Sequence, residues 1–453
     1  MSALKYTPGE IREMIHGLDT PVRGNSPAVN LDNAATTPAF KGVIAEIQEK
    51  LLMYGSIGRG AGQKSEYSSG IYEKGRGAVK QFFGIDPDDE TYTVIYTNNT
   101  TDGINKLASA LIDDQNGDIS VICTRMEHHA NDLPWRERLG NDRIFYVETD
   151  EKGRLEIDGI ERLLSKNRGI KYVCVTAASN VTGYVNDVRM IAKTAHSYGA
   201  KIIVDGAQIA AHRKFDIPGN SPGEDIDFFV FSAHKMYSPF GGGAIIGRSD
   251  ILNRHKPAFY GGGMVDSVYD FNVDYSPPPD LYEAGSPNYP GVVGMLKAME
   301  ILNDIGFDYI CEHERKLMAR TIAGLKNISG ARLYGDNDSY SDRVGIVVFN
   351  IGGFSDSYVA EALARENAIA VRHRKFCAHT YVSRLLKNGG YSQDGMVRVS
   401  FGVYTNEQEI DIFLETAQKI AAGKTAGVFG VTGTENRTAP FAKPGVRLPN
   451  DRG

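Results

Sequence analysis

The sequence places a lysine directly after a short hydrophobic run, where its amine could take part in covalent chemistry. Residues 227–235, DFFVFSAHK, predict a buried strand that ends in small and polar residues before Lys235. Burial lowers the pKa of an amine, and a neutral lysine can form an imine with a carbonyl group. A lysine at a strand end is also commonly an ordinary surface residue, so Lys235 needs a second observation.

A carboxylate closes another hydrophobic run earlier in the chain. Residues 202–208, IIVDGAQ, place Asp205 at the C-terminal end of a strand, the edge at which open α/β sheets bind ligands. A carboxylate there could keep a pyridine nitrogen protonated, which pyridoxal phosphate (PLP) needs in order to accept electrons. Strand-terminal aspartates also cap turns in unrelated folds. The lysine and the aspartate together favour a PLP site, because each closes a strand of one sheet.

These two segments resemble the signature of the class V aminotransferase family, which are fold type I PLP enzymes. Within that family the resemblance is greatest to the short-loop cysteine desulfurases, a group that includes selenocysteine lyases. It covers roughly residues 29–405 and implies that PLP is held as a Schiff base on Lys235. Further matching segments are LDNAATTP (31–38), GRG (58–60), NTTDGIN (99–105), MEHHANDLPW (126–135), SNVTG (179–183), EAGSPN (283–288), VRHRKFCA (371–378) and VRVSFGVYT (397–405).

The resemblance assigns a group of hydroxyl and imidazole side chains to the PLP phosphate. Thr100 and Thr101 fall in a strand-to-helix turn, where backbone N–H groups, hydroxyls and the helix dipole can hold a phosphate. An ordinary N-cap is the alternative interpretation of Thr100. Ser232 and His234 flank the lysine segment and are implied to add contacts to the same phosphate.

Other polar residues are assigned to the cofactor ring. His128 resembles the family histidine that stacks on the pyridine ring, from where it could also move protons. Its neighbour His129 is predicted to take no part. Asn180 and Gln208 match positions near the phenolic oxygen of the cofactor and the carboxylate of the substrate. An asparagine in SNVTG is otherwise explained by turn chemistry.

Two arginines are candidates for binding the substrate. Arg398 lies among apolar residues in MVRVSF, and the resemblance assigns it to the substrate α-carboxylate, which a guanidinium group can bind through two hydrogen bonds. An internal salt bridge is the alternative, and Arg372 is a second candidate. Ser286 stands where the family uses a hydroxyl from the opposite subunit to reach the phosphate, which implies a homodimer with shared active sites.

Cys377 decides which reaction the resemblance implies. In a cysteine desulfurase the lysine moves a proton from Cα of L-cysteine, and an enzyme thiolate then attacks the substrate sulfur. The products are L-alanine and a persulfide on the enzyme, whose sulfur passes to an acceptor protein or a small molecule. A thiolate needs a cationic, partly exposed setting, which the basic residues 372–375, RHRK, could provide.

The residues around Cys377 and Lys235 depart from the family pattern. Short-loop desulfurases usually carry a Thr-Gly-His-His type run before the cysteine, whereas residues 373–376 are HRKF. Residues 238–241 are SPFG, where GPTG is commoner. The alternatives are therefore another class V reaction, such as that of a selenocysteine lyase, aminotransferase, epimerase or C–S lyase, with Cys377 idle. A silent binding protein on the same fold is a third, against which the intact Lys235 and Asp205 argue.

Composition narrows the range of partners. The formal net charge of −6 gives no broad basic field for nucleic acid or anionic membranes. The N-terminus lacks the apolar region of a signal peptide and no apolar run approaches ~20 residues, so we expect a cytoplasmic protein. The 4 cysteines show neither CxxC pairs nor metal-ligand spacing, so we expect no metal site. The resemblance implies L-cysteine or a related amino acid as the substrate.

Short β-branched runs alternate with helical stretches from about residue 93, which predicts a mainly parallel sheet covered by helices. With the resemblance, this indicates an α/β fold of type I, in which a large domain with a seven-stranded sheet precedes a smaller α+β domain. The predicted strands are 94–97, 119–123, 144–147, 172–176, 201–204, 228–231 and 243–246, and the predicted helices between them are 102–111, 157–164 and 188–198.

The chain divides into four predicted parts. Residues 1–25 form an N-terminal arm, 26–291 the large PLP-binding domain, 292–422 the small C-terminal domain and 423–453 a C-terminal extension. Residues 261–290, rich in Gly, Pro and Tyr, predict a long loop that carries function or subunit contacts. In the small domain a strand is predicted at 345–350 and a helix at 356–366.

Overall fold

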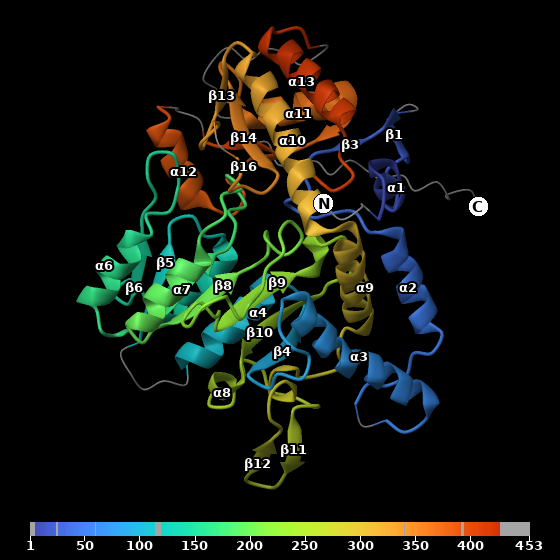
Figure 1. Ribbon diagram of the computed structural model, residues 1–453, viewed down its shortest axis with the longest axis vertical. Coiled ribbons are helices and arrows are strands. Elements are labelled where there is room, and N and C mark those ends of the chain that lie inside the picture. Colours follow the sequence, from blue (N-terminus) through green and yellow to red (C-terminus); the bar gives the residue numbers. More distant parts are fainter. Residues whose placement is uncertain are drawn as a thin grey trace.

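A seven-stranded sheet forms the centre of the computed structural model, which describes residues 5–23, 26–58, 60–113, 119–338, 340–390 and 394–425 (Figure 1). Its order is β4-β10-β9-β8-β7-β5-β6. β10 is antiparallel to both neighbours and all other pairs are parallel, which confirms the predicted fold class. The strands are β4 (Tyr92–Thr97), β5 (Ser120–Thr124), β6 (Ile144–Val147), β7 (Ile170–Thr176), β8 (Lys201–Asp205), β9 (Phe228–Ser232) and β10 (Gly243–Arg248).

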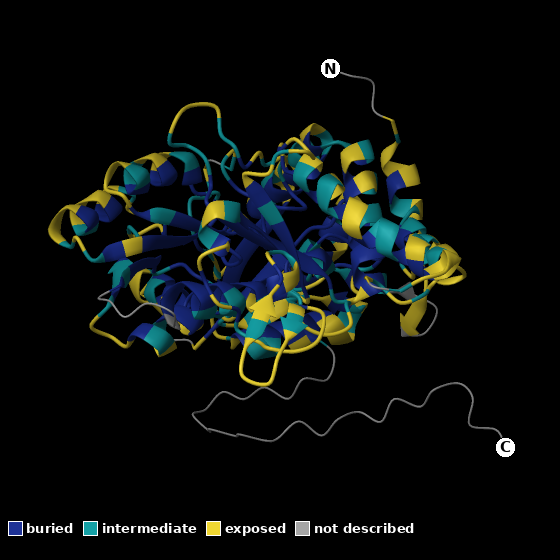
Figure 2. Cartoon of the chain, turned by 90° about the horizontal axis from the view of Figure 1, so that it is seen from below, coloured by how far each residue is buried: buried dark blue, intermediate teal, exposed yellow. Residues whose placement is uncertain are grey.

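The central strands are hydrophobic on both faces because helices cover the sheet on each side. All residues of β9 are buried, and the sheet lies in the buried interior of Figure 2. β-branched and aromatic residues suit such strands, which explains why every predicted strand overlaps an observed one. The helices of this part are α2 (Lys41–Leu51), α3 (Gln63–Phe82), α4 (Thr100–Ala108), α5 (Leu133–Leu139), α6 (Asp158–Lys166), α7 (Val188–Ser197), α8 (Ser249–Leu252) and α9 (Tyr289–Ile305).

A second sheet, of order β13-β14-β17-β16, forms the smaller unit at the top of Figure 1. A parallel pair between β3 and β15 ties the N-terminal segment to this unit. The boundary predicted after residue 291 falls inside α9. Elements of this part are β13 (Ala331–Leu333), β14 (Ile346–Ile351), β15 (Ile369–Ala370), β16 (Arg372–Arg374), β17 (Met396–Ser400), α10 (Phe307–Lys326), α11 (Asp356–Asn367), α12 (His379–Asn388) and α13 (Glu407–Ala421).

The structure describes most of the N-terminal end of the chain but only residues up to 425 at the C-terminal end. The predicted N-terminal arm contains α1 (Pro8–Glu13) and β1 (Pro21–Arg23), followed by β2 (Ser26–Pro27) and β3 (Val29–Asn30). Residues 1–4, 24–25, Arg59 of the GRG segment and all of the predicted extension after residue 425 lie outside the described residues. Among the helices that are described, none combines the length and the hydropathy needed to cross a membrane.

The predicted loop at 261–290 contains a hairpin that projects from the body of the molecule (Figure 1). β11 (Val265–Val268) and β12 (Val273–Tyr275) pair antiparallel to form it. Its tip exposes Tyr269 (59%) and Phe271 (102%), which is unusual for aromatic side chains. Exposed apolar patches of this kind mark interaction surfaces.

An ionic cluster fixes the start of β8 and β9 at the edge of the sheet opposite Lys235. The buried carboxylate of Asp227 accepts the N–H of Ile202 at 2.9 Å and lies 3.0 Å from the amine of Lys201. His196 places Nε2 2.7 Å from the same carboxylate and Nδ1 2.8 Å from the carbonyl oxygen of Gly223. Because both partners only accept hydrogen bonds, both ring nitrogens donate. The hydrogen bond to Asp227 raises the pKa of His196.

This raised pKa makes stability depend on pH in a defined direction. The stabilisation by His196 is fully present below its unfolded pKa of about 6.5 and is lost as the pH rises through the folded-state value. We expect His196→Leu to lower the free energy of unfolding by about 2 kcal/mol at pH 6 and by less at pH 8.5, measured by urea denaturation. His16→Leu, at an exposed histidine, serves as the control. Equal losses at both pH values would contradict the charged state assigned to His196.

Candidate active site

Lys235 ends a short 3-10 helix, η3 (Ala233–Lys235), that directly follows β9. Burial lowers the pKa of its amine to about 8, although the charge of Asp205 opposes this shift. The positive charge of Arg398 lowers the pKa further. An amine with such a pKa is substantially neutral near pH 8, and a neutral amine is the form that attacks a carbonyl group.

Asp205 is the last residue of β8, and β8 and β9 are parallel neighbours, so their C-terminal ends meet at one edge of the sheet. The carboxylate is 3% exposed, and its Oδ1 accepts the N–H of Ala207 at 2.9 Å. Burial raises the pKa of Asp205, while this hydrogen bond and the charge of Lys235 act in the opposite direction. The carboxylate is therefore placed to stabilise a positive charge bound beside it.

Ser232 and Thr100 meet at the N-terminus of α4. The Ser232 hydroxyl accepts the N–H of Thr100 at 2.7 Å, and the two hydroxyl oxygens are also 2.7 Å apart. Asn99 caps the helix by accepting the N–H of Asp102, so Thr100 is the first helical residue and not the N-cap. Thr101, the second residue of α4, is exposed. A helix N-terminus with buried hydroxyls suits an anion such as a phosphate.

The N-terminal segment holds the residue before the lysine. The carbonyl oxygen of His234 accepts hydrogen bonds from the hydroxyls of Thr36 at 3.0 Å and Thr37 at 3.1 Å, and from the backbone N–H of Thr37 at 3.0 Å. The His234 ring lies with Nδ1 3.2 Å from the Thr36 hydroxyl. Burial, reinforced by the charge of Lys235, lowers the pKa of His234 to about 4. The LDNAATTP segment thus fixes η3 in place.

His128 is neutral and fixed in orientation. Burial, together with the charge of Lys235, lowers its pKa to about 3. Its Nδ1 accepts the N–H of Ala130 at 3.1 Å, so Nε2 carries the hydrogen. Because the charge of Lys235 acts on the pKa of His128, the imidazole lies near the amine. A ring that stacks on a cofactor bound to Lys235 must lie there.

A buried carboxylate that the sequence interpretation missed positions the His128 segment. Glu127 accepts hydrogen bonds from the Thr124 hydroxyl at 2.5 Å, the Thr176 N–H at 3.0 Å and the Asn131 amide at 2.7 Å. Burial raises the pKa of Glu127 to about 8. Its contacts join the ends of β5 and β7 to the residues after His128. Only its place in the MEHHAN segment could have indicated this role.

The two amide side chains predicted for the site each donate a hydrogen bond to a backbone carbonyl oxygen. The Gln208 amide donates to the carbonyl oxygen of Ala34 at 2.8 Å, and its Oε1 is buried with no hydrogen-bond partner in the described part of the chain. The Asn180 amide donates to the carbonyl oxygen of Phe376 at 2.7 Å. The unpartnered oxygen of Gln208 is available to a donor from a bound group.

Arg398 enters the site from β17 of the smaller unit. Its guanidinium donates to the carbonyl oxygen of Asn180 at 2.8 Å and lies 3.3 Å from Asp32, and its Nε is buried without a hydrogen-bond partner in the described residues. Arg372 pairs with the same Asp32 at 2.9 Å. Burial lowers the pKa of Arg398 to about 10. Asp32 thus orients both arginines, a role that the sequence signalled only through the matching LDNAATTP segment.

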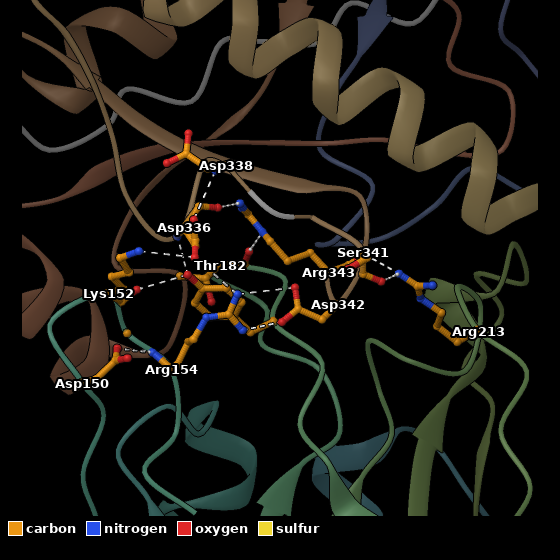
Figure 3. A network of polar contacts seen from close by, with 12 residues as sticks. Asp150, Lys152, Arg154, Thr182, Arg213, Asp336, Asp338, Ser341, Asp342 and Arg343 are labelled. Carbon is orange, nitrogen blue, oxygen red and sulfur yellow. Dashed lines mark hydrogen bonds and ion pairs between the residues drawn. The ribbon is translucent and has the colours of Figure 1, made fainter.

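A polar seam between the two units holds the turn that carries Asn180 (Figure 3). Arg343 is completely buried and donates to three carbonyl oxygens, those of Thr182 at 2.8 Å, Asp336 at 2.9 Å and Ile346 at 2.8 Å. Arg154 forms an ion pair with Asp342. The SNVTG turn is therefore fixed against β14, which pairs with the strand that carries Arg398.

Cys377 lies between β16 and α12 and is exposed, close enough to Lys235 and Arg398 for a thiolate there to interact with both positive charges. Five of the predicted site residues lie near enough to Lys235 to interact with its charge: His128, Asp205, His234, Cys377 and Arg398. Ser286 is exposed and lines a separate cavity with Asn98 and Asp102, beside the N-terminal turn of α4.

Comparisons with known proteins agree with this geometry. Residues 29–413 match the Aminotransferase class-V family. This chain belongs to the class V aminotransferase family. A probable cysteine desulfurase from Halalkalibacterium halodurans is 32% identical over 414 residues, 90% of this chain and 97% of that protein. A cysteine desulfurase from Wigglesworthia glossinidia brevipalpis is 31% identical over 424 residues, 92% of this chain and 98% of that protein.

Solved structures with the same fold include two cysteine desulfurases. The apo structure from Thermococcus onnurineus NA1 has a TM-score of 0.83 and 28% identity, and the match covers 93% of this chain and 100% of that one. The enzyme CsdA from Escherichia coli, in its S-sulfonic acid form, has a TM-score of 0.78 and 26% identity, and the match covers 93% and 99% of the two chains. The family match confirms the resemblance predicted over residues 29–405.

The class V family uses PLP, and the residues of this site fit that cofactor. Among the described residues, the buried oxygen of Gln208 lacks a hydrogen-bond partner, and the buried carboxylate of Asp205 accepts the N–H of Ala207. A phenolic hydroxyl and a protonated pyridine nitrogen would satisfy these two acceptors. Thr100 and Ser232 offer an anion site at the start of α4. The Lys235 amine lies near enough to Asp205 for their charges to interact.

Trapping the cofactor tests this assignment directly. Because burial makes the Lys235 amine a good nucleophile, we expect borohydride reduction of the purified protein to fix PLP on residue 235, with peptide mass spectrometry as the measurement. Lys235→Ala is expected to show no labelled peptide, whereas Lys214→Ala, at an exposed lysine, keeps the label. A label on any other lysine would contradict the site.

Proposed function

We propose that this chain is a PLP-dependent cysteine desulfurase, which converts L-cysteine to L-alanine and forms a persulfide on Cys377. The observation that carries the proposal is an exposed Cys377 that lies close enough to Lys235 and Arg398 for a thiolate there to interact with both positive charges. A nucleophilic cysteine needs access to substrate and nearby positive charge, and Cys377 has both. The relatives named as cysteine desulfurases, which match nearly their whole length, support the same reaction.

The residues of the chain divide the work of substrate binding and proton transfer. Arg398, with its unpartnered Nε, and Arg372 bind the α-carboxylate of L-cysteine, since a guanidinium group matches a carboxylate in shape and charge. PLP supplies an electron sink that makes the Cα proton acidic, and Asp205 maintains that property by holding the pyridine nitrogen protonated. Lys235, whose pKa is lowered to about 8, removes the Cα proton and returns it as an acid.

Cys377 then acts as the nucleophile. Its thiolate attacks the sulfur of the bound cysteine, so that an S–S bond forms as the Cβ–S bond breaks. The electron pair of the broken bond stays on the substrate carbon, which takes up a proton and leaves as L-alanine. The neutral His128 carries a hydrogen on Nε2 and can donate it near this reaction. The persulfide at the exposed position 377 then passes its outer sulfur to an acceptor, which we propose is a protein thiol.

One observation keeps a second candidate open. Arg374 stands where the family pattern has glycine, so the turn before Cys377 differs in sequence from that of typical desulfurases. The backbone of Arg374 nevertheless adopts φ 79°, a conformation that favours glycine. The second candidate is therefore another class V reaction, such as selenocysteine cleavage or transamination, in which Cys377 is idle. The same experiment separates the two proposals.

Replacing Cys377 provides the decisive measurement. We expect Cys377→Ala to keep the visible absorbance of the bound cofactor but to lose at least about 100-fold in alanine formation from L-cysteine, because it removes the nucleophile. Cys311→Ala is the matched control at a partly buried cysteine and should retain full activity. Equal alanine formation by the wild type and Cys377→Ala would leave only the second candidate.

We also propose that the protein works as a homodimer in the cytoplasm. A free thiol at Cys377 requires a reducing compartment. The exposed aromatic side chains of Tyr269 and Phe271 at the hairpin tip, and the exposed Ser286 in the following loop, support a contact with a second copy of the chain. In that dimer Ser286 would approach the phosphate of the opposite site.

Sedimentation tests the dimer. We expect the chain of 49.5 kDa to sediment at twice its own mass. Because a charge buried in an interface is costly, Phe271→Asp should shift the equilibrium toward the monomer by at least about tenfold in dissociation constant. Val22→Asp, at an exposed apolar residue of the N-terminal segment, is the control. A wild-type protein that sediments as a monomer would contradict the proposal.

A further inference from the structure

The turn that carries Cys377 has an unusual backbone. Arg374 (φ 79°), Phe376 (φ 49°) and Cys377 (φ 54°) all adopt left-handed conformations, and none of them is glycine. Side chains with a Cβ atom disfavour this region, and residues held there persist only where the surrounding structure fixes them. The direction of the Cys377 thiol therefore depends on the contacts that hold the turn.

Hydrogen bonds from outside the turn hold it at three of its residues. The Asp356 carboxylate accepts the N–H of Arg374 at 2.8 Å. The Asn180 amide donates to the carbonyl oxygen of Phe376 at 2.7 Å. The carbonyl oxygen of Cys377 itself accepts the backbone N–H of His129 at 2.7 Å. His129 is thus the residue that contacts the backbone of Cys377 from outside the turn.

The side chain of His129 makes a second contact on the other side of the cysteine. Its Nε2 accepts the backbone N–H of His379, the first residue of α12, at 3.4 Å. The two imidazole rings also pack edge to face, with centroids 4.6 Å apart. His129 therefore contacts the chain at Cys377 and two residues later. It directly follows His128, so one short segment joins the cofactor-facing ring to the cysteine turn.

We propose that His129 is a positioning residue for Cys377. The His129 imidazole accepts the first N–H of α12 and thereby holds the Cys377 thiol toward the reaction centre. This inference rests on the proposed desulfurase function for its effect on turnover, but not for its effect on the reactivity of Cys377. It differs from the expectation that His129 takes no part.

The acceptor role requires the neutral imidazole. Burial, followed by the positive charge of His379, lowers the pKa of His129, and Arg136 acts in the same direction while Asp132 opposes it. His128, with its ring centroid 6.4 Å away, is neutral and adds no charge. The ring is therefore neutral at neutral pH. In acid, Nε2 gains a proton, cannot accept a hydrogen bond, and releases α12.

Two variants of the full-length holoenzyme distinguish the effect of the hydrogen-bond acceptor of His129 from that of the rest of its ring. His129→Leu removes the acceptor, whereas His129→Gln keeps an amide oxygen at a similar reach but does not titrate. Two rates are measured for each protein, alanine formation from L-cysteine and alkylation of Cys377 by iodoacetamide, with peptide mass spectrometry to identify the residue. The visible absorbance of PLP reports whether the cofactor site is intact.

At neutral pH we expect His129→Leu to lower alanine formation about fivefold, with an altered Cys377 alkylation rate and unchanged cofactor absorbance. His129→Gln should stay within about twofold of the wild type. As the pH falls below 6, the wild type should lose activity faster than His129→Gln, because only the wild type loses its acceptor. A structural role of the ring alone would not produce this pH-dependent ratio.

Two results would overturn the inference. One is a Cys377 alkylation rate in His129→Leu equal to that of the wild type, and the other is a ratio of His129→Gln to wild-type activity that does not change with pH. A different result would disprove the proposed function without bearing on the role of His129. A wild-type protein that forms no alanine from L-cysteine would disprove the desulfurase, while its alkylation rates would still test His129.

Discussion

The site depends on the opposition between burial and charge at Lys235 and Asp205. Burial removes both groups from water, which lowers the pKa of the amine and raises that of the carboxylate, while their mutual attraction opposes each shift. The result is an amine with a pKa of about 8 beside a buried carboxylate. This balance exists because β8 and β9 are adjacent parallel strands, so that two residues distant in sequence leave the sheet at the same edge.

The rest of the site is built on that edge by segments from elsewhere in the chain. Thr36 and Thr37 bind the carbonyl of His234 and so fix η3, while Asp32 from the same segment joins Arg372 to Arg398. The N-terminal segment 29–37 therefore contacts both sheets, and its strand β3 also pairs with β15. Because Arg372 and Arg398 come from the smaller unit and Lys235 from the larger one, their relative position depends on the N-terminal segment and on the hydrogen bonds around Arg343 (Figure 3).

The sequence predicted those parts of the site that local pattern determines. Lys235 and Asp205 were found because hydrophobic runs end at them, and the seven strands because β-branched and aromatic residues mark buried strands. Glu127 and Asp32 were missed, since their roles come from contacts with residues far away in sequence. The hydrogen bond from Thr176 to Glu127 joins the end of β7 to the segment after β5, and the ion pair between Asp32 and Arg398 joins residues 366 positions apart in the sequence. Such contacts leave no periodic signal.

The departure from the family pattern before Cys377 has a physical consequence in the structure. Glycine adopts left-handed conformations without steric cost, whereas Arg374 adopts φ 79° with a full side chain. The turn compensates for this cost through hydrogen bonds, one of which runs from the N–H of Arg374 to Asp356 at the first turn of α11. Replacing a flexible residue by a constrained one also reduces the freedom of the turn. A nucleophile held in this way is positioned by its surroundings, so Cys377 depends on residues of both units rather than on its own loop.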